Sequence, residues 1–137
     1  MKFEDCIRKK LVIKRMQDKE AAKGLKKLAD TRLEEMENIR TATLRAESYY
    51  EIIKELITSL LAVEGFKSYS HECLISFLEY KSRNFNKQEI NLIDQLRIIR
   101  NDIAYRGIFI EDDYLIRNEK KILEIINKLK GELNRRI

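Results

Sequence analysis

The sequence predicts an all-α protein, an up-and-down antiparallel bundle of about five helices in one domain covering residues 1–137. Three observations predict this class. The chain has no proline and only four glycines, which favours long helices. Apolar residues recur at intervals of three or four along most of the chain, the spacing of one helix face. No segment of useful length alternates with a period of two, so no strand is expected.

The first two helical runs lie before residue 40. Apolar residues stand at nearly helical spacing through residues 3–16. A second amphipathic run covers residues 19–39, and Asp18 just before it is a residue type that caps helices. The two runs are either separate helices or one long helix with an irregular joint.

The strongest pattern in the chain covers residues 41–63. Its wide apolar face indicates a central helix that packs against more than one neighbour. Gly65 is expected to end this helix in a left-handed turn. A further helix then begins at Ser68 or Ser70 and continues to about Tyr80.

The last two helices follow a loop at residues 82–87. Asn86 and Glu89 resemble a capping box, with Asn in place of Ser or Thr. The helix that they start runs to about residue 105, and Gly107 ends it. The final helix begins at Asp112 or Asp113.

Composition limits the classes of function. The formal net charge is +5, and the excess lies in the first 27 residues; this basic stretch is either a solvated helix face or a surface that attracts phosphate backbones. Cys6 and Cys73 have no metal-ligand spacing, so we expect buried free thiols and neither a metal nor another cofactor. The charged start and the lack of a long apolar run predict a cytoplasmic protein without a membrane anchor.

The densest polar cluster lies in residues 96–107, LRIIRNDIAYRG. On an ideal helix Arg100 stands about 60° from the centre of the apolar face, so it is half shielded and needs a partner. Arg100 and Tyr105 diverge by about 140°. They share a site only if the last turn loosens or if a second copy brings its own motif across a two-fold axis. Ile98 on the outer side favours the second copy.

Several features in order resemble HEPN domains, small helical bundles that often act as ribonuclease toxins. The resemblance covers roughly residues 20–130 and is strongest at Arg100-Asn101, where Tyr105 stands in place of the histidine of the family's Arg-x(4–6)-His motif. The other matching residues are Tyr49-Tyr50, Leu60-Leu61, Gly65, Ser70-His71 and Gly107.

The resemblance implies a homodimer with two copies of the motif at its interface. In active members the arginine holds the scissile phosphate and the histidine moves protons during metal-independent RNA cleavage. It therefore implies that Arg100, Asn101 and Tyr105 form the catalytic site, with weak or lost activity, since tyrosine has a reference pKa near 10. His71 replaces the missing group only if folding brings it beside Arg100. A minimal nucleotidyltransferase is the implied partner in a toxin–antitoxin pair.

Two other functions fit the same residues. The chain is a non-enzymatic helical module that binds RNA or nucleotide through Arg100, or it is a protein-interaction bundle. In the second case Arg100 simply bridges to a carboxylate on another helix, and Tyr105 packs at the edge of the core.

Overall fold

Six α-helices, a 3-10 turn, a π-helical turn and a two-stranded antiparallel sheet make up the chain. The computed structural model describes all residues, Met1–Ile137. In order the elements are α1 (Phe3–Arg8), β1 (Val12–Lys14), α2 (Lys19–Glu35), η1 (Met36–Asn38), α3 (Ala42–Glu64), β2 (Phe66–Ser68), α4 (His71–Ser76), η2 (Phe77–Ser82), α5 (Lys87–Arg106) and α6 (Asp112–Asn134). The predicted all-α helical bundle is confirmed.

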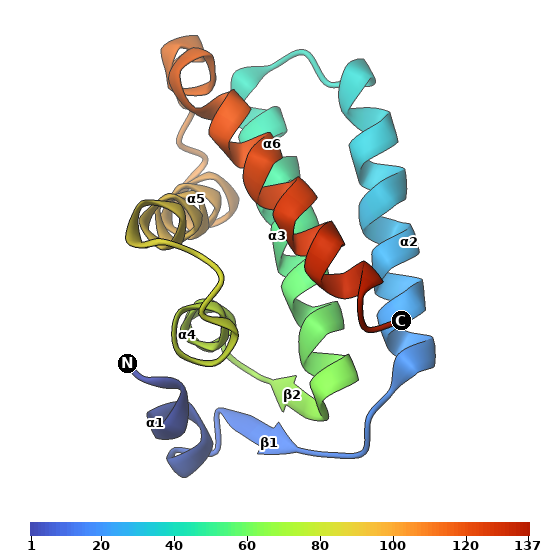
Figure 1. Ribbon diagram of the computed structural model, residues 1–137. Helices are drawn as coiled ribbons and strands as arrows, with labels where there is room; N and C mark the ends of the chain where they lie inside the picture. Colours follow the sequence, from blue (N-terminus) through green and yellow to red (C-terminus); the bar gives the residue numbers. More distant parts are fainter.

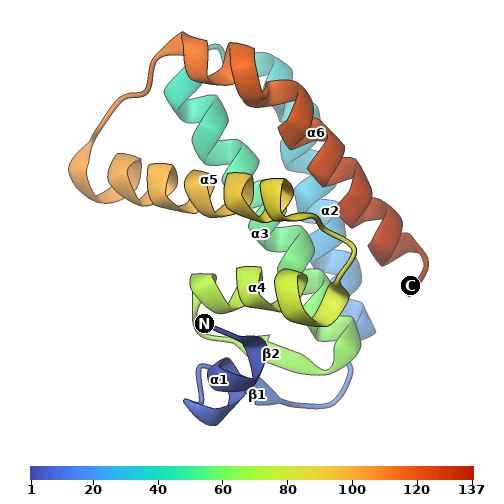
Figure 2. The ribbon, with the colours of Figure 1, turned by 60° about the vertical axis from the view of Figure 1, so that its left-hand side comes forward.

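The centre of the bundle is α3. It lies beside α2 and α6, while α4 and α5 run across it (Figures 1 and 2). Ile52, Ile53 and Leu56 are fully buried although they point in different directions, because α3 is covered from several sides. The predicted central helix is therefore confirmed. None of the helices combines the length and the apolar character needed to cross a bilayer.

Helix ends follow the local sequence closely. The Asp18 side chain accepts a hydrogen bond from the first turn of α2, at 3.0 Å. Asn86 and Glu89 form both bonds of a capping box at the start of α5. Gly65 and Gly107 both adopt left-handed conformations, with φ of +85° and +63°. A Cβ at Gly65 would also lie 2.8 Å from a backbone carbonyl in the segment after β1.

The segment at residues 3–16 is not one helix, which corrects the sequence-based expectation. After α1 the chain turns at Lys10, whose φ is +62°, and β1 then pairs with β2 in antiparallel register. Val12 lies opposite Ser68 in this two-stranded sheet. The strands have three residues each, which is too short for a period-two pattern to appear in the sequence.

Cys6 and Cys73 form a disulfide, so the expectation of free thiols is wrong. Their Cα atoms are 6.0 Å apart, and neither residue has exposed surface. The bridge joins α1 to α4. Spacing along the chain did not indicate it, because the two residues are 67 positions apart and only the packing of α1 against α4 brings them together.

The helix after Ser70 changes its winding before it ends. Ser70 caps α4, as one of the two predicted starts, and the helix continues as the π-helical turn η2. Arg83 ends this turn with a φ of +59°. A left-handed non-glycine residue beside a π turn is a combination that often marks a functional site.

The C-terminal half of α5 extends beyond the core. Leu96 is the last fully buried residue on this helix. After it, the side chains of Ile98 and Tyr105 are 49% and 77% exposed, and the chain then passes through an exposed connector to α6. Figure 2 shows this end of α5 projecting from the bundle.

Candidate functional site

Arg100 lies where α5 crosses α3, and its side chain is 21% exposed. Its Nε donates a hydrogen bond to Oε1 of Glu51 on α3 at 3.1 Å. Its Nη1 donates weakly to Oδ1 of Asn101 at 3.4 Å. The sequence predicted a carboxylate, a phosphate or another chain as the partner of Arg100, and a carboxylate of the same chain fills this role. The pair holds one side of the guanidinium, while Nη2 makes no hydrogen bond.

Glu51 is shared between two cations. Its Oε2 lies 2.7 Å from Lys54 Nζ, one turn along α3. Burial alone would raise the pKa of Glu51, but the hydrogen bond from Lys54 and the charges of Lys54 and Arg100 lower it below its usual value. Glu51 is therefore ionised at neutral pH and positions both cations.

His71, the only histidine, also belongs to this cluster. It is the first residue of α4, and its ring lies 5.9 Å from that of Tyr50, centroid to centroid. Burial lowers the pKa of His71, and the charges of Lys54 and Arg100 lower it further. The imidazole is therefore mostly neutral at pH 7 and able to accept a proton.

Arg97, one turn before Arg100, extends the cluster along α5. Its Nε bonds Oδ1 of Asp94 at 2.9 Å, and its Nη1 lies 3.9 Å from Glu72 on α4. The cations of the cluster are thus matched by nearby carboxylates. This balance restrains the side chains, and it also weakens the net positive field that a phosphate group would meet.

The structure separates the three residues predicted as catalytic. Arg100 and Asn101 are adjacent and hydrogen-bonded, whereas Tyr105 is 77% exposed and has no hydrogen bond to either of them. The last turn of α5 stays helical up to Arg106, so it does not loosen to bring Tyr105 back.

Glu51, which bonds Arg100, and its neighbours Lys54 and Tyr50 were not identified from the sequence as part of the site. One signal was present, because Glu51 and Lys54 stand three apart, a spacing at which side chains on a helix can interact. The direction of α5 across α3 decides which charged residue meets them, and no local pattern encodes that direction.

The chain has no group of three or more His, Cys, Asp or Glu side chains placed to hold a metal ion. Comparisons with protein-family models, with curated proteins and with solved structures found no match. The resemblance to HEPN domains therefore rests on the motif residues alone.

Proposed function

We propose that this chain is a HEPN-like homodimer that binds RNA through Arg100, with weak or lost metal-independent ribonuclease activity. One observation carries the proposal: the Arg100 guanidinium is held from one side by Glu51, keeps Nη2 without a hydrogen bond, and lies in the same cluster as a neutral histidine. A planar, permanently charged group with free donors suits a phosphate.

His71 supports the catalytic half of the proposal better than Tyr105 does. A general base needs a pKa near the working pH, and a tyrosine with a reference value near 10 is mostly protonated there. His71 is mostly neutral at pH 7, because burial lowers its pKa, and its ring lies 5.9 Å from that of Tyr50, the residue before Glu51. We therefore assign any residual proton transfer to His71, with Asn101 as a positioning residue for Arg100.

Exposed apolar residues at and after the projecting C-terminal end of α5 support the homodimer. Tyr105 is followed by Phe109, 76% exposed, and by Ile116 on α6, 81% exposed. Apolar side chains of this size, exposed to water on α5, on the connector and on α6, gain free energy by packing against a second copy. Two-fold pairing at this end of α5 would bring the Arg100 clusters of both copies toward the dimer interface.

The proposed setting is a two-protein system in the cytoplasm, where RNA is available. The partner would be a minimal nucleotidyltransferase that silences the toxin-type chain. The Cys6–Cys73 disulfide is compatible with a reducing compartment because both residues are fully buried. A reductant reaches the bond only when α1 separates from α4.

The Arg100–Glu51 pair also favours a second candidate, a protein-interaction bundle in which the pair is structural. Two variants separate the candidates. Arg100→Ala should fold, because Glu51 keeps Lys54 as a partner, and should lose RNA affinity. Glu51→Gln releases the guanidinium, so it should strengthen RNA binding if Arg100 meets phosphate, and should only lower stability if the pair is structural.

The assay measures binding and cleavage of a labelled single-stranded RNA at two salt concentrations. Arg106→Ala is the matched control, since it removes the same charge from an exposed residue of α5 that pairs only with Asp102. RNA affinity that is equal in the natural protein and in Arg100→Ala, or a loss of the same size in Arg106→Ala, would contradict the proposal.

A further inference from the structure

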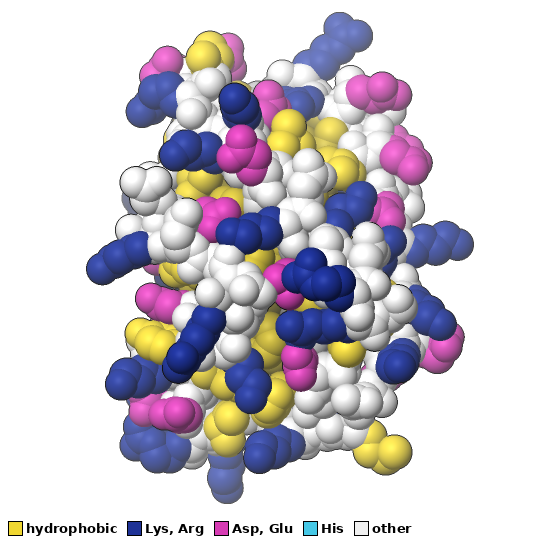
Figure 3. All heavy atoms as spheres, viewed as in Figure 1, with side chains coloured by type: hydrophobic (Ala, Val, Ile, Leu, Met, Phe, Trp, Pro, Cys, Tyr) yellow, Lys and Arg dark blue, Asp and Glu magenta, His cyan; other side chains and the backbone are white.

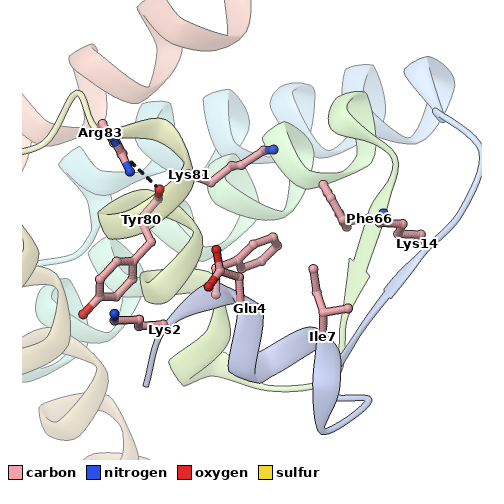
Figure 4. A pocket seen from close by; sticks show the side chains of 9 residues that line it. Lys2, Glu4, Ile7, Lys14, Phe66, Tyr80, Lys81 and Arg83 are labelled. Atoms are coloured by element: carbon pink, nitrogen blue, oxygen red, sulfur yellow. Dashed lines mark hydrogen bonds between the residues drawn. The ribbon is translucent and has the colours of Figure 1, made fainter.

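A cavity of about 360 Å³ lies at the other end of the α4–η2 helix from His71 (Figure 4). It is open to solvent on one side and is lined by residues of α1, of the β1–β2 sheet and of the end of η2. Its volume falls within the range of small-molecule sites, roughly 300–1,000 Å³. Figure 3 shows that Lys and Arg side chains predominate over the lower left of the molecule, where α1, β1 and α4 lie.

Four cationic side chains line this cavity, together with a single carboxylate. The cations are Lys2, Lys14, Lys81 and Arg83, and the carboxylate is Glu4. None of the five forms an ion pair within the chain. This contrasts with the Arg100 cluster, where each cation has a carboxylate close to it. The cavity therefore has a net positive potential that favours an anion.

Aromatic rings provide the apolar part of the same cavity. Phe66 from β2 and Tyr80 from η2 both line it, and Tyr80 is 38% exposed. Figure 4 shows Lys2 near the Tyr80 ring and Lys14 near Phe66. Such rings offer surfaces on which a nucleobase can stack, and Glu4 can accept a hydrogen bond from an exocyclic amino group.

The backbone that presents Arg83 is strained for an arginine. Its φ of +59° is a conformation that glycine adopts easily, and it ends the only π-helical turn of the chain. The one hydrogen bond of its side chain runs from Nε to the Tyr80 carbonyl at 3.3 Å, which leaves both terminal nitrogens free. These two free nitrogens, at the lining of the cavity, are donors suited to an anionic oxygen.

We propose that this cavity, which we call the basic pocket, binds a phosphorylated nucleoside. Lys81 and Arg83 contact the phosphate, the base lies against Phe66 or Tyr80, and Glu4 accepts a hydrogen bond from the base. A free nucleotide and a single-stranded RNA both carry the phosphate and the base that this pocket would contact. The proposal does not depend on Arg100.

The test titrates the whole protein with adenosine monophosphate, with a short single-stranded RNA and with inorganic phosphate, at low salt, by calorimetry or NMR. The decisive variant is Arg83→Gly, which removes the side chain and suits the local φ, so it should keep or raise the melting temperature. We expect the affinity for adenosine monophosphate to fall by about tenfold or more, as for loss of a charge-assisted contact. Inorganic phosphate should bind about ten times more weakly than the nucleotide, because it cannot stack.

Lys10→Gly is the matched control. Lys10 has a φ of +62° and is exposed, but it does not line the basic pocket, so its replacement changes charge and strain equally. It should leave the affinity within about twofold of the natural value. Arg100→Ala should also leave it unchanged, which separates this proposal from the proposed function.

Several outcomes would overturn the assignment. They are no binding of either nucleotide or RNA, equal losses in Arg83→Gly and Lys10→Gly, equal affinity for phosphate and nucleotide, or binding to anionic lipid vesicles only. If RNA binds more tightly than the nucleotide and its binding depends on Arg83 to the same extent, the natural ligand is single-stranded RNA. Equal affinities identify a free nucleotide.

Discussion

The Arg45 side chain on α3 connects this helix to η1 and to α6. Its Nη1 donates to the carbonyls of Met36 and Ile39 at 2.7 and 2.8 Å, at the end of η1. Its Nη2 donates to Glu119 on α6 at 2.7 Å, and the Tyr49 hydroxyl donates to the same carboxylate at 2.6 Å. Burial, and to a smaller extent the bond to Glu119, raises the pKa of Tyr49 to about 12, so its hydroxyl remains protonated and donates the hydrogen bond.

Glu119→Gln should lower the free energy of unfolding at pH 7 by about 1–3 kcal/mol, the usual contribution of hydrogen bonds to a charged group. The bonds from Tyr49 and Arg45 hold the pKa of Glu119 below its usual 4.5 in the folded state. Its contribution is therefore complete above the unfolded pKa and is lost as the pH falls through the folded value.

Urea denaturation at pH 7 and at pH 3 measures this effect. The difference between the natural protein and Glu119→Gln should be larger at pH 7. A difference that is the same at both pH values would show that the carboxylate charge adds nothing. Glu124→Gln is a suitable control, because Glu124 on the same helix forms no ion pair.

At the scale of elements, the N-terminal segment is fastened to the bundle in three ways. Strand β1 pairs with β2 in the segment after α3, the Ser76 hydroxyl donates to the Met1 carbonyl at 2.7 Å, and the Cys6–Cys73 disulfide joins α1 to α4. The basic pocket lies between these elements, so its shape depends on this attachment.

Removal of the disulfide should lower the free energy of unfolding by about 4 kcal/mol, because the bridge closes a long loop in the unfolded chain. Denaturation curves with and without a thiol reductant measure this. The double variant Cys6→Ala, Cys73→Ala provides the control, since its curve should not respond to the reductant. An unchanged curve for the natural protein after complete reduction would exclude a stabilising role.

For the whole molecule, the main asymmetry is the end of α5 that projects from the bundle (Figure 2). The core ends at Leu96 on this helix, while exposed apolar side chains continue as far as Ile116. The β1–β2 sheet and the basic pocket lie elsewhere, where α1 packs near η2. The two proposed contacts, with a second copy and with a nucleotide, therefore use different parts of the molecule.

Light scattering after size-exclusion chromatography should give twice the 16.4 kDa mass of one chain. Phe109→Ser with Ile116→Ser should yield the monomer without a loss of stability, because both side chains are already exposed. Met16→Ser is the control, since Met16 is 89% exposed but lies in the N-terminal segment. A monomeric natural protein would remove the homodimer from the proposed function.

The candidate site was predicted in part. Arg100 was expected to need a partner, either a carboxylate, a phosphate or another chain, since its place on the helix follows from a fixed rotation per residue. Which carboxylate meets it, and that His71 joins the cluster, depends on how α4 and α5 cross α3. Tyr105 was assigned to the site by position in a motif, and the structure leaves it in solvent.

Local sequence patterns account for the all-α class and most helix ends, including the caps at Asp18, Ser70 and Asn86 and the turns at Gly65 and Gly107. Those features depend on residues within one or two turns of each other. The two-stranded sheet, the disulfide, the charge cluster and the basic pocket arise only when the helices pack together. Each of these joins residues far apart in the chain, and burial of apolar surface, which has no preferred direction, brings them together.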